Sequence, residues 1–202
     1  MNRSVIFHIG MNRSKAKLGK GADGTRLVRE IRILPDGSTY FQPYWPEHQD
    51  PDFANRTYGD DAPQLMSFML NLGEGDWVWF IESVSVTSYT DWGYHIVYGF
   101  DVEAHYFQNA GMGDWKDVSE GHIRRLSKSA HYPIWKNDCV VILGKEETSR
   151  DLFKKPLRIS IGEDPYPWLK EAMGISITRE LTGYWFKRVF GERVTRAILE
   201  RI

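Results

Sequence analysis

The chain has 202 residues, of which 42% are hydrophobic and 26% charged, and its formal net charge is −1. This length is enough for one domain with a core but small for two, and the apolar runs are too short to cross a membrane. A single cysteine, Cys139, excludes a framework of internal disulfides, and the first residues lack the features of a secretory signal, so we expect a cytoplasmic protein.

The predicted elements begin with a short apolar strand at 5–9. The Lys-, Gly- and Ser-rich stretch at 11–25 predicts a mobile loop. A second strand is expected at 27–34, where a Pro-Asp-Gly turn signal follows. Residues 42–64 are rich in proline, aspartate and aromatic residues without periodicity, which predicts a long irregular loop of the kind that often carries function.

Helical spacing of apolar residues then predicts a helix at 62–72. Two β-prone runs at 77–81 and 92–102, separated by a polar stretch, predict an antiparallel pair. Later elements are expected as strands at 139–144 and 156–161 and as helices at 167–173 and 192–202. Strands dominate the middle and helices the end, so we predict one α+β domain over 1–202, with a curled, mainly antiparallel sheet and flanking helices.

Two kinds of bound group are not predicted. Residues 19–24 match the GxGxxG spacing, but no strand precedes them and no helix follows, so we predict no nucleotide cofactor. The six histidines lack the close spacings of a metal site, so we predict no metal. Glu47, Asp50 and Asp52 would suit magnesium, although a solvated acidic loop explains the same residues.

Aromatic residues make up 14% of the chain, with 8 Trp, 10 Tyr and 10 Phe. In a strand over 77–81, the odd and even positions point to opposite faces. On the predicted strand pair, this alternation places Trp77 and Trp79 on one face of the first strand and Trp92, Tyr94 and Tyr98 on one face of the second. Such rings form either a core or an open slot in which a stacked base gains ~1–3 kcal/mol per ring. We expect most to fill the core and one or two of Trp77, Trp79, Trp92 and Tyr94 to face a ligand.

Charge is distributed in three blocks: 8 Lys/Arg against 2 Asp/Glu in 1–35 (+6), 2 against 15 in 36–120 (−13), and 16 against 10 in 121–202 (+6). This excludes a uniformly basic nucleic-acid coat, but both a basic surface built from the two ends and ordinary clustered surface charge fit it. Lys145, Ser149 and Arg150 directly follow a predicted strand and suit a phosphate cradle, while a turn cap formed by Ser149 fits equally well.

The order of several short motifs resembles the third of the nucleotide-modification-associated domain families. These motifs are FQPYWPE at 41–47, TYGD at 57–60, GDWVWF at 75–80, YHIVYGFDV at 94–102, Ala130-His131, DCVVILG at 138–144 and Ser149-Arg150. The family is associated with DNA base modification in bacterial and phage genomes. The Gly-Asp turn between β-runs also resembles EVE, ASCH and PUA-like barrels, which hold a modified or flipped base in an aromatic pocket. The resemblance therefore implies a PUA-like barrel.

This resemblance also implies site residues. The polar positions are Glu47, Tyr58, Asp60, His131, Ser149 and Arg150, and the strand aromatics are Trp79 and Tyr94. Residues 85–92 depart from the family pattern, which has a short loop there. Tyr58 thereby joins the expected base-binding residues.

Three functions follow from these expectations. The first is a nucleic-acid-associated domain that recognises a modified or extruded base, with nucleic acid or a nucleotide as partner. The second is an enzyme on a nucleobase or nucleotide, with His131 as general base and Asp60 or Glu47 as its electrostatic partner. The third is a protein-interaction subunit with exposed tryptophans.

Overall fold

The structure is a computed structural model of the chain. It describes residues 2–8, 29–33, 39–43, 53, 55–60, 63–85, 92–109, 118–127, 138–152, 155–162, 164–175 and 189–202. The loop predicted at 11–25, and much of the loop predicted at 42–64, lie outside these ranges.

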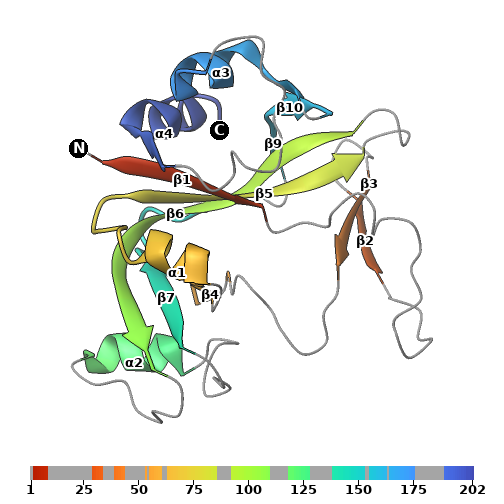
Figure 1. Ribbon diagram of the computed structural model, residues 1–202. Coiled ribbons are helices and arrows are strands. Elements are labelled where there is room, and N and C mark those ends of the chain that lie inside the picture. The colour runs from red at the N-terminus through yellow and green to blue at the C-terminus, as the bar shows by residue number, and fades with distance from the viewer. Residues whose placement is uncertain are drawn as a thin grey trace.

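One large sheet forms the centre of the molecule (Figure 1). Its strand order is β12 (Val189–Gly191), β1 (Arg3–His8), β5 (Trp77–Ser85), β6 (Trp92–Gln108), β7 (Cys139–Gly144) and β4 (Thr57–Asp60). The β1–β5 pair is parallel and the other pairs are antiparallel. The prediction of an α+β fold with a mainly antiparallel sheet is therefore confirmed. Within the described ranges the sheet stays open between β12 and β4.

The longest strand, β6, is paired along most of its length. In sequence order, β7, β8 (Arg150–Asp151) and β9 (Leu157–Arg158) pair with successively earlier parts of β6. The single strand predicted at 156–161 is wrong in detail, because the chain leaves the ladder at Ile159. That residue is buried and its N–H donates to the Tyr94 carbonyl (2.8 Å). The next residues form β10 (Ser160–Ile161), which pairs with β11 (Asp164–Pro165).

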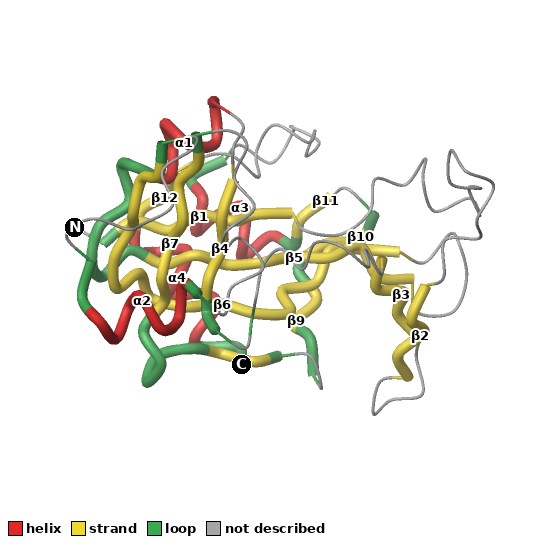
Figure 2. Tube along the Cα trace, turned by 90° about the horizontal axis from the view of Figure 1, so that it is seen from below, coloured by secondary structure: helices red, strands yellow, loops and turns green. Residues whose placement is uncertain are grey.

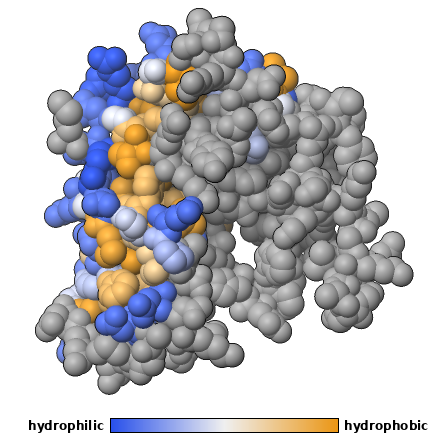
Figure 3. Space-filling view, viewed as in Figure 1, coloured by the Kyte–Doolittle hydropathy of each residue, from blue (hydrophilic) through white to orange (hydrophobic). Residues whose placement is uncertain are grey.

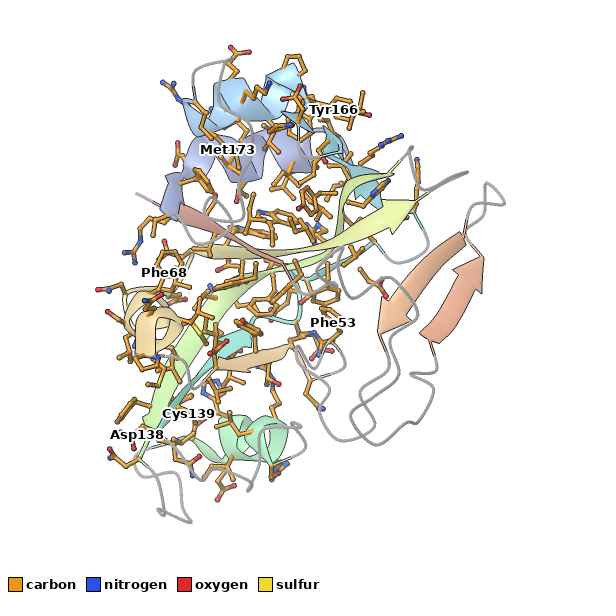
Figure 4. All side chains as sticks on the ribbon, turned by 45° about the vertical axis from the view of Figure 1, so that its right-hand side comes forward. Phe53, Phe68, Asp138, Cys139, Tyr166 and Met173 are labelled. Carbon is orange, nitrogen blue, oxygen red and sulfur yellow. The ribbon has the colours of Figure 1, made fainter. Side chains whose placement is uncertain are left out.

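Helices cover both faces of the sheet. α3 (Pro167–Met173) and α4 (Glu192–Leu199) lie on one face, and α1 (Pro63–Met69) lies on the other (Figures 1 and 4). All three lie within predicted helices. None of the helices in the described ranges is long and apolar enough to cross a membrane.

Several elements were not predicted, among them α2 (Glu120–Leu126), β4 and β3 (Thr39–Pro43). α2 begins at Ser119, whose hydroxyl accepts a hydrogen bond from the His122 N–H (3.3 Å). β4 contradicts the irregular loop predicted at 42–64, since its backbone pairs with β7. β3 completes a hairpin with β2 (Arg29–Ile33), which confirms the strand predicted at 27–34; the hairpin lies to one side of the large sheet (Figure 2).

The alternation predicted for 77–81 is confirmed. Odd positions such as Trp77 and Trp79 belong to the core cluster beneath α3 and α4, whereas the even positions Val78 and Phe80 belong to the cluster beside α1. A third cluster joins α2 to β7 through Leu126 and the odd positions of β7. The sheet therefore separates the core beneath α3 and α4 from the core beside α1, and residues on these opposite faces cannot contact one small ligand.

A β-bulge makes the alternation predicted for β6 wrong. Phe80 pairs with Tyr98 and Ile81 with Ile96, so Val97 is an extra residue on β6. A bulge shifts the two-residue period by one position. Tyr98 consequently lies in the core cluster of Phe80, while Tyr94 and Ile96 lie in the opposite one.

Candidate functional site

The aromatic rings expected to face a ligand are mostly in the core. Trp79 is 0% exposed, Tyr58 7%, and Trp77 and Tyr94 each 9%. Tyr58 also lies on the opposite sheet face from the other three. Of the two alternatives, a core or an open slot, the described side chains of this set form a core; the side chain of Trp92 lies outside the description.

Trp79 is held by contacts on several sides. Its ring stacks on that of Trp77, with centroids 4.9 Å apart and planes inclined by 16°. Its indole N–H donates to Thr195 Oγ1 on α4 (3.0 Å), and the hydroxyls of Thr195 and Ser4 share a hydrogen bond of 2.7 Å. Thr195 and Ser4 are both buried. This polar link satisfies the indole, so Trp79 serves as a core residue.

Trp77 differs from Trp79 because it borders an opening. A pocket of about 400 Å³ lies between the start of β1, the start of β5 and one side of α4. It is lined by Asn2, Arg3, Trp77, Glu192, Thr195, Arg196, Leu199 and Glu200. The α4 residues recur at intervals of three and four, which is the spacing of one helix face. The pocket is thus built from both ends of the chain around one indole.

A strong ion pair fixes Arg3 at this pocket. Its Nε donates to Asp76 Oδ2 (2.9 Å) and its backbone N–H to Asp76 Oδ1 (2.7 Å), while Nη2 also donates to the Asn71 carbonyl. Burial favours a higher pKa for Asp76, but the hydrogen bonds from Arg3 and from the Gly73 N–H hold that pKa below its usual value. Asp76 is therefore ionised at neutral pH and orients the guanidinium.

The second guanidinium of the pocket is more exposed. Arg196 Nη2 lies 3.1 Å from Glu192 Oε1, one helical turn away, and both side chains are more than half exposed. Such surface pairs contribute only about 0–1 kcal/mol, so a ligand can exchange them at small cost. Two arginines and two glutamates line the pocket, which gives its lining no net formal charge.

The predicted phosphate-binding residues have partners within the chain. Lys145 Nζ contacts Glu74 Oε1 (3.0 Å) and Asp101 Oδ2 (3.7 Å). The Ser149 hydroxyl donates to the Lys145 carbonyl (2.7 Å), and Arg150 Nη1 donates to the carbonyls of Thr148 (2.8 Å) and Ser149. The structure thus shows the hydrogen-bonded turn that the sequence offered as the alternative to a cradle.

The expected catalytic residues are not brought together by the described part of the chain. His131 and Glu47 lie outside it. Asp60 ends the edge strand β4, where Oδ2 accepts a hydrogen bond from the Tyr58 hydroxyl (3.3 Å). Asp60 shares a face of β4 with Tyr58, whose ring lies in the opposite core cluster from Trp77.

Sequence reasoning missed most of the pocket. Arg3, Thr195 and Arg196 were not singled out, because their neighbours in space are far away in sequence: 116 residues separate Trp79 from Thr195. The available signal was the polar face of the predicted helix at 192–202, on which Glu192, Arg196 and Glu200 recur every four residues.

No three His, Cys, Asp or Glu side chains are grouped as metal ligands within the described ranges. Comparisons with protein-family models, with curated proteins and with solved structures found no match.

Proposed function

We propose that the chain is a nucleic-acid-associated domain that recognises a modified or extruded base, in a DNA-modification context, and that the base enters the pocket beside Trp77. One observation carries this proposal: among the rings expected from the sequence to contact a base, Trp77 borders a pocket of about 400 Å³ that guanidinium groups also line. That volume is within the usual range for small-ligand sites.

The charge balance of the pocket favours a base over a phosphate group. The two arginines are matched by Glu192 and Glu200 in the lining, and Arg3 is further neutralised by Asp76. A phosphate would require a net positive site, whereas a base edge presents both donors and acceptors. Asn2 and Thr195 add neutral polar groups to the same wall. The proposed ligand is therefore an uncharged, flat, hydrogen-bonding group.

In this proposal, cationic side chains at the rim of the pocket contact the nucleic-acid backbone. Lys145 is bound to Glu74, and Arg3 is bound to Asp76, so the turn at 73–76 links these two cations. Arg150 follows on the same segment as Lys145. The PUA-like barrel implied by the resemblance stays part of the proposal.

Binding of oligonucleotides to the full chain tests the proposal. Single- and double-stranded DNA carrying a modified base should compete better than unmodified DNA, as measured by isothermal titration calorimetry. Trp77→Leu removes the aromatic face, and Arg196→Gln removes one pocket guanidinium. Loss of one stack should weaken binding by about 5- to 150-fold, corresponding to ~1–3 kcal/mol.

Arg193→Gln is the matched control. Arg193 is an exposed residue of the same helix and does not line the pocket, so its replacement removes the same charge outside the site. Equal losses for Arg193→Gln and Arg196→Gln would contradict the proposed site. The dependence of the association constant on salt concentration supplies a second test. Each phosphate contact makes the slope of log association constant against log salt concentration more negative by about 0.7 to 0.9, whereas contacts to a base alone predict a shallow slope.

The two alternative functions give other outcomes in the same assays. An enzyme acting on a nucleobase or nucleotide, with His131 as general base, would release a product that disappears in His131→Ala. A protein-interaction subunit would bind no nucleic acid. Figure 3 shows a hydrophobic band on one face, but within the described ranges the large exposed apolar residues lie singly on separate elements, which is normal for a surface. These residues are Leu70, Phe107, Ile161, Val189 and Ile202.

A further inference from the structure

A second β-bulge directs an acidic side chain of β6 toward α2. Val102 pairs with Gly144 and Ala104 with Leu143, so Glu103 is an extra residue on β6. Bulges redirect side chains and recur beside active sites. Here the carboxylate contacts two residues of α2, His122 and Arg125, at the end of the molecule away from α4 (Figure 1).

These residues form a continuous hydrogen-bonded chain. The Tyr106 hydroxyl and His122 Nδ1 lie 2.5 Å apart, and His122 Nε2 lies 2.8 Å from Glu103 Oε1. Since a carboxylate only accepts, the neutral imidazole carries its proton on Nε2 and accepts from the Tyr106 O–H at Nδ1. All three side chains are partly buried.

Arg125 fixes the far end of this chain. Its Nη1 donates to Glu103 Oε2 (2.5 Å), while Nε and Nη2 donate to the carbonyls of Asn55 (both 3.2 Å) and Gly144 (2.5 Å). These contacts, with the hydrogen bond from His122, hold the pKa of Glu103 below its usual value against the effect of burial. Glu103 therefore stays ionised and accepts the hydrogen bond from His122 Nε2.

The order hydroxyl, imidazole, carboxylate is that of a nucleophile with its general base and orienting group. Burial and the nearby Glu103 carboxylate raise the pKa of Tyr106, so the phenol keeps its proton until a base removes it. His122 is placed to do so.

We propose that Tyr106 is a nucleophile activated by His122 and Glu103, and that it accepts an acyl group from an activated ester. Tyr106 Oη attacks the ester carbonyl carbon while its proton passes to His122 Nδ1. The bond from that carbon to the leaving oxygen breaks, and the imidazolium returns the proton to the leaving oxygen. The products are an O-acyl tyrosine and an alcohol, with no change in oxidation state.

An acyl group fits this position better than a phosphoryl group. A phosphoryl group would bring negative charge next to Glu103, and the adjacent guanidinium of Arg125 is already committed to that carboxylate and to two backbone carbonyls. A neutral ester carries no such penalty. This activity is separate from the pocket beside Trp77, so either proposal can fail alone.

Acetylation of the full chain by p-nitrophenyl acetate at neutral pH tests the proposal. Peptide mass spectrometry follows the acetyl group on Tyr106 and on Tyr166, which is also partly buried and serves as an internal control. General-base assistance predicts acetylation of Tyr106 on the order of 10²-fold faster than that of Tyr166. Equal rates in the wild-type chain would overturn the proposal, and this comparison does not depend on the folding of any variant.

Variants separate activation from a structural role. His122→Asn keeps an acceptor for the Tyr106 hydroxyl but supplies no base, so acetylation should fall to the Tyr166 rate while circular dichroism stays unchanged. In His122→Ala, which lacks both the base and the acceptor, acetylation of Tyr106 should likewise fall to the Tyr166 rate. A purely structural histidine would show neither effect, and retention of the full rate in His122→Asn would also refute the role of His122.

Discussion

Replacing Gly99 with alanine tests how closely the core is built around Trp79. Gly99 lies on β6 opposite Trp79, and a Cβ added there would lie 2.2 Å from the indole Cε3. On its other side the same residue pairs with Arg150 of β8, so the backbone is held from both edges. The indole has to move because the strand is held.

The indole in turn has little freedom. It stacks on Trp77 and donates a hydrogen bond to Thr195, so a displacement of about an ångström overpacks the core and weakens that bond. Overpacking costs about 1–3 kcal/mol, and a buried donor without its acceptor costs about 1–3 kcal/mol more. We expect Gly99→Ala to lower the free energy of unfolding by about 2–6 kcal/mol, which lowers Tm by roughly 4–24 °C in a domain of this size.

Urea unfolding followed by circular dichroism measures this loss. Gly121→Ala is the control, because Gly121 lies on the exposed side of α2 with open space around it and should be neutral or stabilising by up to about 1 kcal/mol. In a Trp79→Leu background, Gly99→Ala should cost much less. If Gly99→Ala is as harmless as Gly121→Ala in the wild-type background, the close approach of Trp79 to β6 is not as described.

Three further measurements examine the same core and the pocket. The pKa of Asp76 is lowered in the folded state, so its ionised carboxylate stabilises the fold above about pH 4, and this stabilisation is lost as pH falls through the lowered pKa. In Asp76→Asn, the free energy of unfolding should therefore fall less between pH 4 and lower pH than in the wild-type chain. Thr195→Val removes the acceptor of the Trp79 N–H and should lower the free energy of unfolding by about 1–3 kcal/mol. Thr195→Ser keeps the acceptor and should lower it by less than about 1 kcal/mol, so equal losses in the two variants would refute the hydrogen bond. Cys139 is 0% exposed, so a thiol reagent such as DTNB should label it only on unfolding, and rapid labelling of the native chain would contradict its burial.

Sequence periodicity predicted the elements whose apolar residues follow one local pattern. Strand β5 and helices α1, α3 and α4 are of this kind, since each carries its own apolar spacing. β4 has the sequence TYGD, which shows no alternation and becomes a strand only because β7 supplies its hydrogen bonds. Its position therefore depends on contacts that residue type does not encode.

The bulges explain why the candidate sites were harder to predict than the fold. Val97 shifts Tyr98 to the opposite core, which separates rings that simple alternation placed together. Glu103 turns toward His122 for the same reason. A single inserted residue leaves no mark in composition or spacing, because it becomes visible only as a change of partner on the neighbouring strand.

The charge blocks were compatible with a surface built from both ends of the chain, but they did not predict the potential of that surface. β1 pairs with β12 and α4 contacts β1, so Arg3 and Arg196 from the two basic ends of the chain line one pocket. Each guanidinium nevertheless lies beside a carboxylate, Asp76 from the acidic middle of the chain and Glu192 from α4 itself. Since opposite charges in contact cancel beyond about 10 Å at moderate salt, these paired groups create no long-range basic field around the pocket. For this reason the proposed function assigns the pocket a ligand without net charge, held by stacking and hydrogen bonding.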